Sequence, residues 1–286
     1  IASQQNRPQT KSSAAFRELV YGDHPFGRDS DGSIESLDLI SVADLHAFHK
    51  AHIARDGLVV AVVGDISAEE LTVRLDQVFG ELPMEGDTVE TQPVSNQSAG
   101  VEKLIEFDQP QTSLLVVQDS IKRNDPDFFA AYVVNHILGG GSFSSRLYQE
   151  IREKRGLTYG VGTSLGGDLK SPLMYAQLQT ANDTARQALD ILRSEWQLMA
   201  TEGPTQAEMD KAVKYIVGSY ALQFTNTSAI AGNLLGLQIG KRPKSYINDR
   251  VAIFKALTLE DLKGAAKRVL DDSKWTLIVT GKPEGF

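Results

Sequence analysis

Residues 250–282 read RVAIFKALTLEDLKGAAKRVLDDSKWTLIVTGK, and residues 33–65 read SIESLDLISVADLHAFHKAHIARDGLVVAVVGD. The two stretches align without a gap at an offset of 217 positions. Each pattern predicts a short helix, a turn at which Ser41 or Thr258 starts a second helix, and a buried strand that ends at Gly64 or Gly281. A match of this length without a gap is best explained by duplication of a domain.

The repeat also sets the expected domain boundaries. A polar stretch, GDTVETQPVSNQSAG at 86–100, is typical of a linker, and the second copy starts near Val101. Its counterpart in the first copy would lie well before Ile1. We therefore expect residues 1–85 to be the C-terminal half of a first domain, 86–100 to be a linker and 101–286 to be a complete second domain. The chain is then expected to be a processed product or a fragment.

The second domain is predicted to belong to the α+β class, with a mostly antiparallel sheet packed with helices. Strands before helices along the chain, and short turns between strands, favour this class over a doubly wound sheet. The expected strands are 101–107, 112–121, 157–165, 173–180 and 275–280, and the expected longer helices are 125–138, 144–155, 183–201 and 205–224.

Composition excludes several kinds of partner. The net charge of −8 argues against nucleic acid and against an anionic membrane surface. The absence of Cys excludes disulfides and thiolate chemistry, and it fits cytosol and periplasm equally. The longest apolar run, 58–64, is far shorter than the roughly 18 residues that a membrane-spanning helix needs.

The stretch 139–159, GGGSFSSRLYQEIREKRGLTY, runs from three glycines through a charged helix into a strand. Alternation along that strand places Tyr159 on the face of Val161 and Thr163, opposite a nearly bare face of Thr158, Gly160, Gly162 and Ser164. One interpretation is structural, with Tyr159 in the core and Arg152 in solvent. The other is functional: Arg152 and Tyr159 form a polar pair over a groove, where they hold a carbonyl or an oxyanion.

The motif LGGGSFSSRLYQEIREKRGLTYGV resembles the second-domain signature of the pitrilysin/insulinase zinc metallopeptidases, which include mitochondrial processing peptidase. YGDHPFGR at 21–28, with the helix and strand that follow, resembles the back half of that family's first domain. The resemblance implies duplicated domains, and a second domain without metal whose Arg and Tyr meet the substrate. Arg152 and Tyr159 have the family's spacing, and the resemblance implies that Gly139, Gly140 and Gly141 form a substrate loop.

In the family, zinc is held by an HxxEH motif and a downstream Glu of the first domain. No HxxEH occurs in this chain, so we expect it to bind no metal and to contain no catalytic residue. The zinc is expected in the parent enzyme or in a partner chain. His136 falls where the motif would lie in the second copy, and without a second His it reads as a vestige in the core.

Three other motifs give weaker evidence for a metal, catalytic or phosphate site. His46, His49 and His52 fan over about a third of a helix circumference, whereas zinc helices place two His four residues apart. Residues 162–166 match G-x-S-x-G, but the context is a hairpin rather than a strand that runs into a helix. The GGGS run lacks the Lys that completes a phosphate-binding loop.

These observations predict the substrate-binding C-terminal part of a zinc metalloendopeptidase that acts on peptides or small unfolded proteins. The alternative is a noncatalytic subunit that completes a zinc-bearing partner in a homo- or heterodimer. A generic ligand-binding module is a third reading. The expected partners are a peptide substrate and either a missing N-terminal segment or that partner subunit. A periplasmic or cell-envelope location in a bacterium follows from the resemblance alone.

Overall fold

The computed structural model describes residues 6–87 and 89–286, which form two compact units. Unit 1 contains the chain up to Gly32 together with Thr91–Tyr215 and Ile253–Phe286. Unit 2 contains Ser33–Glu90 and Ile216–Ala252. The predicted site residues all lie in unit 1: Arg152, Tyr159, Gly139, Gly140 and Gly141.

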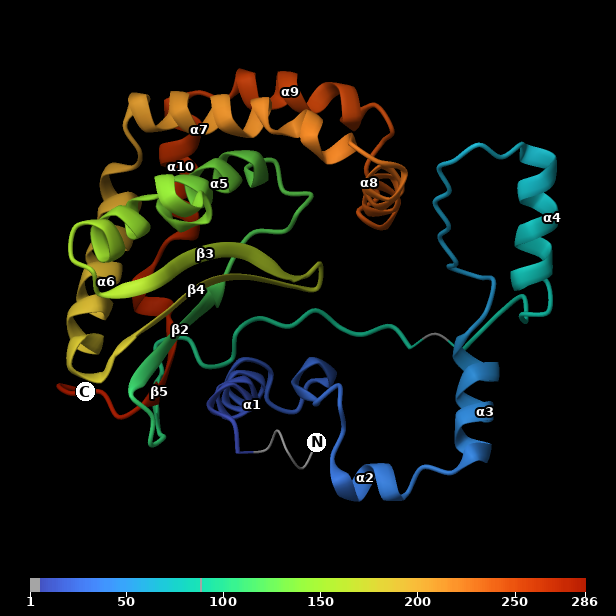
Figure 1. The fold of residues 1–286 in the computed structure, drawn as a ribbon, viewed down its shortest axis with the longest axis horizontal. Coiled ribbons are helices and arrows are strands. Elements are labelled where there is room, and N and C mark those ends of the chain that lie inside the picture. Colours follow the sequence, from blue (N-terminus) through green and yellow to red (C-terminus); the bar gives the residue numbers. More distant parts are fainter. Residues whose placement is uncertain (1–5, 88) are drawn as a thin grey trace. The chain divides into compact units, whose positions relative to one another are not determined.

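Unit 1 is built on a five-stranded sheet in the order β1-β5-β2-β4-β3 (Figure 1). All neighbouring strands are antiparallel except β1 and β5, which are parallel. The strands are β1 Glu102–Glu106, β2 Gln111–Asp119, β3 Thr158–Asp168, β4 Ser171–Ala181 and β5 Thr276–Gly281. This mixed architecture of a mostly antiparallel sheet packed with helices confirms the predicted fold class.

Helices cover both faces of the sheet. On one face, α10 (Leu259–Val269) packs on α5 (Phe128–Asn135) and α6 (Ala185–Glu202), and Trp196 meets Trp275 edge to face in this core. On the other face, α1 (Pro8–Tyr21) inserts Val20 and Tyr21 against Val117 of β2 and Leu173 of β4. Burying side chains of this size contributes about 2 kcal/mol each.

The remaining helices complete both units. They are α2 Ile34–Asp38, α3 Val42–His52, α4 Ala68–Phe79, α7 Gln206–Gly218, α8 Thr227–Ile239 and α9 Tyr246–Ala256. Short 3₁₀ turns cover Pro25–Gly27, Ser142–Ser144, Asn182–Thr184, Tyr220–Phe224 and Asp272–Lys274, and two π-helical turns cover His136–Gly140 and Tyr148–Glu153.

Helices α3 and α10 are the second helices of the two sequence repeats, and they have the same length and the same start. Each has eleven residues and begins with a capping box, Ser41 with Asp44 in α3 and Thr258 with Asp261 in α10. In each box the N-cap hydroxyl accepts from the backbone N–H of the Asp, and the carboxylate accepts from the N-cap N–H. The predicted helix starts are therefore confirmed at both positions, 217 residues apart.

The predicted buried strand at 58–64 is wrong. Residues 58–63 have no strand pairing, and they run as irregular chain before α4 (Figure 1). Leu45 is 59% exposed whereas its counterpart Leu262 is fully buried, and Val60 is 38% exposed whereas its counterpart Leu277 is fully buried. A strand forms only against a neighbouring strand, and β5 has β1 and β2 on its two sides. Among the described residues no strand flanks 58–63.

Three predicted helices are shorter or wound differently than expected. The helix predicted at 125–138 is α5 followed by the π-turn, and the one predicted at 205–224 is α7 followed by a 3₁₀ turn. The helix predicted at 144–155 is largely the π-turn Tyr148–Glu153. Leu147 and Ile151 are fully buried, as their spacing predicts. π-Helical turns within helices are frequent at functional sites.

Part of the predicted linker 86–100 is tied to unit 1. The buried Asn96 donates from Nδ2 to Thr276 Oγ1 at 2.8 Å, and its backbone N–H donates to Asp119 Oδ1 at 2.8 Å. The Ser98 hydroxyl donates to the carbonyl of Leu19 in α1 at 2.6 Å. The predicted domain boundaries remain a prediction, because the two units are defined by contacts between residues and not by the sequence repeat.

Candidate functional site

Tyr159 is directed out of the protein by a β-bulge at the start of β3. Thr158 pairs with Thr180 of β4, but the next pair is Val161 with Leu178, so β3 carries one extra residue. Both Thr158 and Val161 are buried, while Tyr159 between them is 88% exposed. The prediction that Tyr159 shares the face of Val161 is therefore wrong. Bulges commonly re-aim a side chain beside a functional site.

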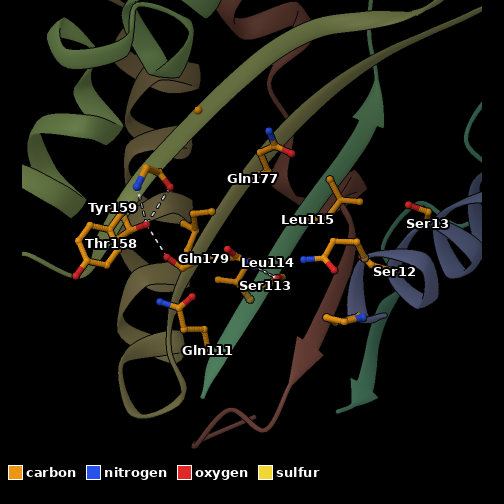
Figure 2. A pocket seen from close by; sticks show the side chains of 15 residues that line it. Ser12, Ser13, Gln111, Ser113, Leu114, Leu115, Thr158, Tyr159, Gln177 and Gln179 are labelled. Atoms are coloured by element: carbon orange, nitrogen blue, oxygen red, sulfur yellow. Dashed lines mark hydrogen bonds between the residues drawn. The ribbon is translucent and has the colours of Figure 1, made fainter. Parts of the chain in front are cut away.

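The Thr158 hydroxyl holds this bulge in place. It donates to the carbonyl of Gln179 at 2.5 Å, and it accepts from the N–H of Gly160 at 3.1 Å (Figure 2). The Thr180 hydroxyl donates to the carbonyl of Leu157 at 2.5 Å from the facing strand. The hydroxyl groups of two threonines thus bond backbone groups on both sides of the register shift.

Arg152 lies in the π-turn Tyr148–Glu153, which packs against β3. Its guanidinium lies 4.7 Å from the ring centre of Tyr148 and 5.9 Å from that of Phe143, and its side chain is 34% exposed. Its Nη1 donates to Glu153 Oε1 at 3.4 Å, a long contact. Arg152 and Tyr159 therefore lie on neighbouring elements, but within the described chain no hydrogen bond joins them.

The three glycines of the predicted substrate loop sit where side chains would collide. A Cβ on Gly139 would lie 2.7 Å from the Thr163 side chain and 2.8 Å from its backbone nitrogen. A Cβ on Gly140 would lie 2.5 Å from Asn135 Nδ2, and one on Gly141 would lie 2.7 Å from the carbonyl oxygen of His136. These contacts give a packing reason for the glycines: Gly139 lies directly on β3, and Gly140 and Gly141 lie close to Asn135 and His136 of the preceding turn.

A groove of about 630 Å³ opens on the sheet between α1 and Tyr159 (Figure 2). We name it the carboxamide groove. Its floor includes Gln111, Ser113 and Leu115 of β2, Gln177 and Gln179 of β4, and Gly160 and Gly162 of β3, and its wall includes Gln9, Ser12 and Ser13 of α1. Tyr159 stands at the end opposite Ser12 and Ser13 in Figure 2.

Arg146 and Glu208 fix the segment that carries Arg152. Arg146 Nε donates to Glu208 Oε1 at 2.6 Å and Nη2 donates to Oε2 at 2.8 Å, although the spacing of Arg146 and Glu150 would also allow an i,i+4 pair. Glu150 instead pairs with Lys154 and Arg155. Burial would raise the pKa of Glu208, but hydrogen bonds from Arg146 and Thr205 outweigh it and lower that pKa to about 2.

None of the residues that line the carboxamide groove is a histidine. His46, His49 and His52 are exposed on α3, and His52 Nδ1 lies 2.8 Å from the carbonyl oxygen of Asp87. His136 is half-buried and stacks on Tyr215 at 5.3 Å between ring centres, and burial lowers its pKa. The G-x-S-x-G stretch at 162–166 lies inside β3 and not at a strand-to-helix turn.

Across residues 6–87 and 89–286, no group of three or more His, Asp or Glu side chains could hold a metal ion. The zinc that the resemblance implies is expected in the parent enzyme or in a partner chain. Within the same residues, no helix is both long and apolar enough to cross a bilayer.

The family model of the peptidase M16 inactive domain matches residues 39–216, more than half of the chain. The chain belongs to this family. The family suggested by the 139–160 motif is thereby confirmed, and the match extends over both the motif and the segment that precedes it.

Solved and curated relatives agree with this assignment. A crystal structure of a peptidase M16 inactive domain from Pseudomonas fluorescens is 33% identical, with a TM-score of 0.89, and the match covers 99% of this chain and 67% of that one. An uncharacterised zinc protease of Streptomyces coelicolor is 26% identical over 89% of this chain and 57% of its own length. A probable inactive metalloprotease of Bacillus subtilis is 23% identical over 92% of this chain and 61% of its own length.

These relatives show a peptidase-like fold whose members carry names of both kinds, zinc protease and inactive or non-peptidase homologue. The chain spans about three fifths of the length of the curated relatives it matches over most of its own length.

Sequence reasoning missed the residues that shape the site. Thr158 looked like one of several small residues, and its part in the bulge depends on its pairing with β4, which the sequence does not show. The groove floor had a signal: Gln111 and Ser113 in β2, and Gln177 and Gln179 in β4, alternate with buried residues. Alternating neutral polar residues on adjacent strands indicate a polar sheet face.

Proposed function

We propose that this chain is the substrate-holding C-terminal part of a zinc metalloendopeptidase that acts on peptides or small unfolded proteins. The observation that carries the proposal is the exposure of Tyr159, which the bulge holds outward beside the π-turn of Arg152. A phenol and a guanidinium both donate hydrogen bonds at neutral pH, and they can bind a substrate carbonyl or stabilise an oxyanion.

The zinc, its ligands and the general base belong in this proposal to a part of the parent protein outside these residues. Unit 2 supports such a complement, because α3 and residues 58–63 expose the apolar positions that α10 and β5 bury. We propose that an N-terminal segment supplies the two strands that flank 58–63, one parallel and one antiparallel, as β1 and β2 flank β5.

The test is hydrolysis of a fluorogenic peptide by the full-length protein carrying Tyr159→Phe or Arg152→Lys. Loss of one oxyanion donor lowers kcat roughly 100-fold, so we expect a fall of that order with a smaller change in KM. Tyr215→Phe and Arg186→Lys are matched controls on exposed helix positions and should retain activity. Unchanged kcat in both Tyr159→Phe and Arg152→Lys would remove these residues from catalysis.

A second candidate is a noncatalytic subunit, which the names of the Bacillus subtilis relative and of a Helicobacter pylori non-peptidase homologue favour. Zinc content and activity of the full-length protein separate the two. One zinc per chain with hydrolysis supports the peptidase. A zinc-free, inactive protein that restores hydrolysis when mixed with a zinc-bearing homologue supports the subunit.

A further inference from the structure

The carboxamide groove begins where the cover provided by α1 ends. In β4, alternate residues Leu173 and Tyr175 lie under α1, with Phe16 of α1 6.0 Å from the Tyr175 ring. The next residues on that face are Gln177 and Gln179, which are exposed. The face thus changes from apolar to polar within one step of the strand, and the polar part is left open.

A similar change occurs in β2, one residue pair further along. Val117 is buried beneath α1 and faces Tyr175, Leu115 still faces Gln177, and Ser113 faces Gln179. Gln179 Nε2 donates to Ser113 Oγ at 2.9 Å across the strands. The polar residues of the two strands therefore meet at Ser113 and Gln179, and the floor extends to β3, where a Cβ on Gly160 would meet open space.

None of the residues that line this groove is charged, although 23% of the chain is Asp, Glu, Lys or Arg. Within the described part of the chain, the carboxamides of Gln111 and Gln177 have no side-chain hydrogen-bond partner. Each carboxamide offers two donors and an acceptor oxygen with two lone pairs. A peptide group presents the complementary set of one donor and one acceptor without net charge.

We propose that the carboxamide groove binds an extended, uncharged peptide segment that continues from the part of the substrate beside Tyr159. This inference rests on the proposed function and adds a substrate class to it. The groove favours segments of neutral polar and small residues, because a charged side chain would lose hydration there without gaining an opposite charge. Binding is accordingly insensitive to salt, since no ion pair is screened.

The experiment measures fluorescence anisotropy of labelled peptides with the full-length protein at low and at high NaCl. One peptide contains only Gln, Ser, Ala and Gly, and a second of equal length has Lys and Glu at alternate positions. We expect the neutral peptide to bind more tightly, with affinity unchanged by salt. Gln177→Ala and Gln111→Ala should each weaken it by about 3- to 10-fold, the loss expected for one hydrogen bond. Gln187→Ala, at an exposed position of α6, is the matched control.

The outcomes separate this inference from the proposed function. If neither peptide binds, both fail. If peptides bind and Tyr159→Ala weakens them, but Gln111→Ala and Gln177→Ala do not, the proposed function stands and the groove assignment is overturned. Tighter binding of the charged peptide would also overturn the groove assignment. Displacement of the neutral peptide by a neutral oligosaccharide such as maltohexaose would overturn it too, and would make the groove a sugar site.

Discussion

Arg146 and Glu208 form a two-point ion pair that joins the segment preceding Arg152 to the first turn of α7. Arg146 also donates from Nη2 to the carbonyl of Gly203 at 3.2 Å, and Glu208 accepts from the N–H of Thr205 at 2.7 Å. Both side chains are mostly buried, with 15% and 30% exposed. The pair therefore holds the segment before Arg152 against the start of α7, unlike an exposed surface ion pair.

Replacing Arg146 with Ala should lower the free energy of unfolding by about 1–3 kcal/mol, because the partly buried carboxylate of Glu208 is left with fewer donors. Urea denaturation measures the change. Arg186→Ala breaks an exposed pair with Asp190 one helical turn away and should cost less than about 0.5 kcal/mol. Equal losses of unfolding free energy in the two variants would show that the Arg146–Glu208 pair stabilises the protein no more than an exposed ion pair does.

The same pair makes stability depend on pH at the acidic end. The pKa of Glu208 is about 2 in the folded protein and about 4.3 in an unfolded chain. The folded state thus binds fewer protons, so the stabilisation is complete above the unfolded value and is lost as pH falls from about 4 towards 2. Urea denaturation of the protein and of Glu208→Gln should differ at pH 7 and converge at low pH. A difference that grows on acidification would refute the assignment.

Thr158→Ala should destabilise the β-bulge, so that the side chain of Tyr159 is no longer held in its outward direction. Removal of the hydroxyl leaves the carbonyl of Gln179 and the N–H of Gly160 without their partner, at a cost of about 1–2 kcal/mol. On the proposed function, peptide hydrolysis or binding falls together with stability. Thr158→Ser keeps the hydroxyl and should restore both. If Thr158→Ser behaves like Thr158→Ala, the hydroxyl is not what holds the bulge.

Gly139→Ala should destabilise the protein by about 1–3 kcal/mol, because the new methyl group meets the side chain and backbone of Thr163. Gly160→Ala, within β3, places its methyl in open space and should change stability little. Thermal unfolding of the two variants compares them directly. A stable Gly139→Ala variant would leave the substrate-loop role as the better reason for glycine at this position.

The paired repeat positions Leu45 and Leu262 test the complement proposed for unit 2. Leu262→Glu places a charge in the core formed by α5, α6 and α10 and should prevent folding of unit 1. Leu45→Glu should be nearly neutral in the 286-residue chain, where the side chain is exposed. In a full-length protein that carries the N-terminal complement it should be strongly destabilising. A neutral effect in both forms would exclude burial of this face.

Local patterns in the sequence predicted the parts of the fold that depend on near neighbours. Capping residues placed the starts of α3 and α10 correctly, and apolar runs together with alternation placed the five strands of the sheet. The differences from the sequence-based expectation arise where residues distant in the sequence determine the direction or the partner of a side chain. Tyr159 turns outward because β3 gains a residue relative to β4, and Arg146 prefers Glu208, which is 62 positions away, to the adjacent turn.

The candidate site follows the same rule. Spacing and resemblance identified Arg152 and Tyr159, because both lie in one short continuous motif. The carboxamide groove needs the register of β2 with β4 and the position where α1 stops, and neither can be read from one segment. The strand predicted at 58–63 failed for the related reason that a strand, unlike a capped helix, has no hydrogen bonds of its own.

The unpaired segment Leu58–Val63 also has a consequence for handling the protein. It is a run of six apolar residues, four of them valine, with no charge and no proline, and such segments assemble readily into intermolecular β-structure when they are exposed. The 286-residue chain should therefore aggregate increasingly as its concentration is raised. Nascent chains that expose this run before its neighbours are in place would depend on chaperones until the run is sequestered.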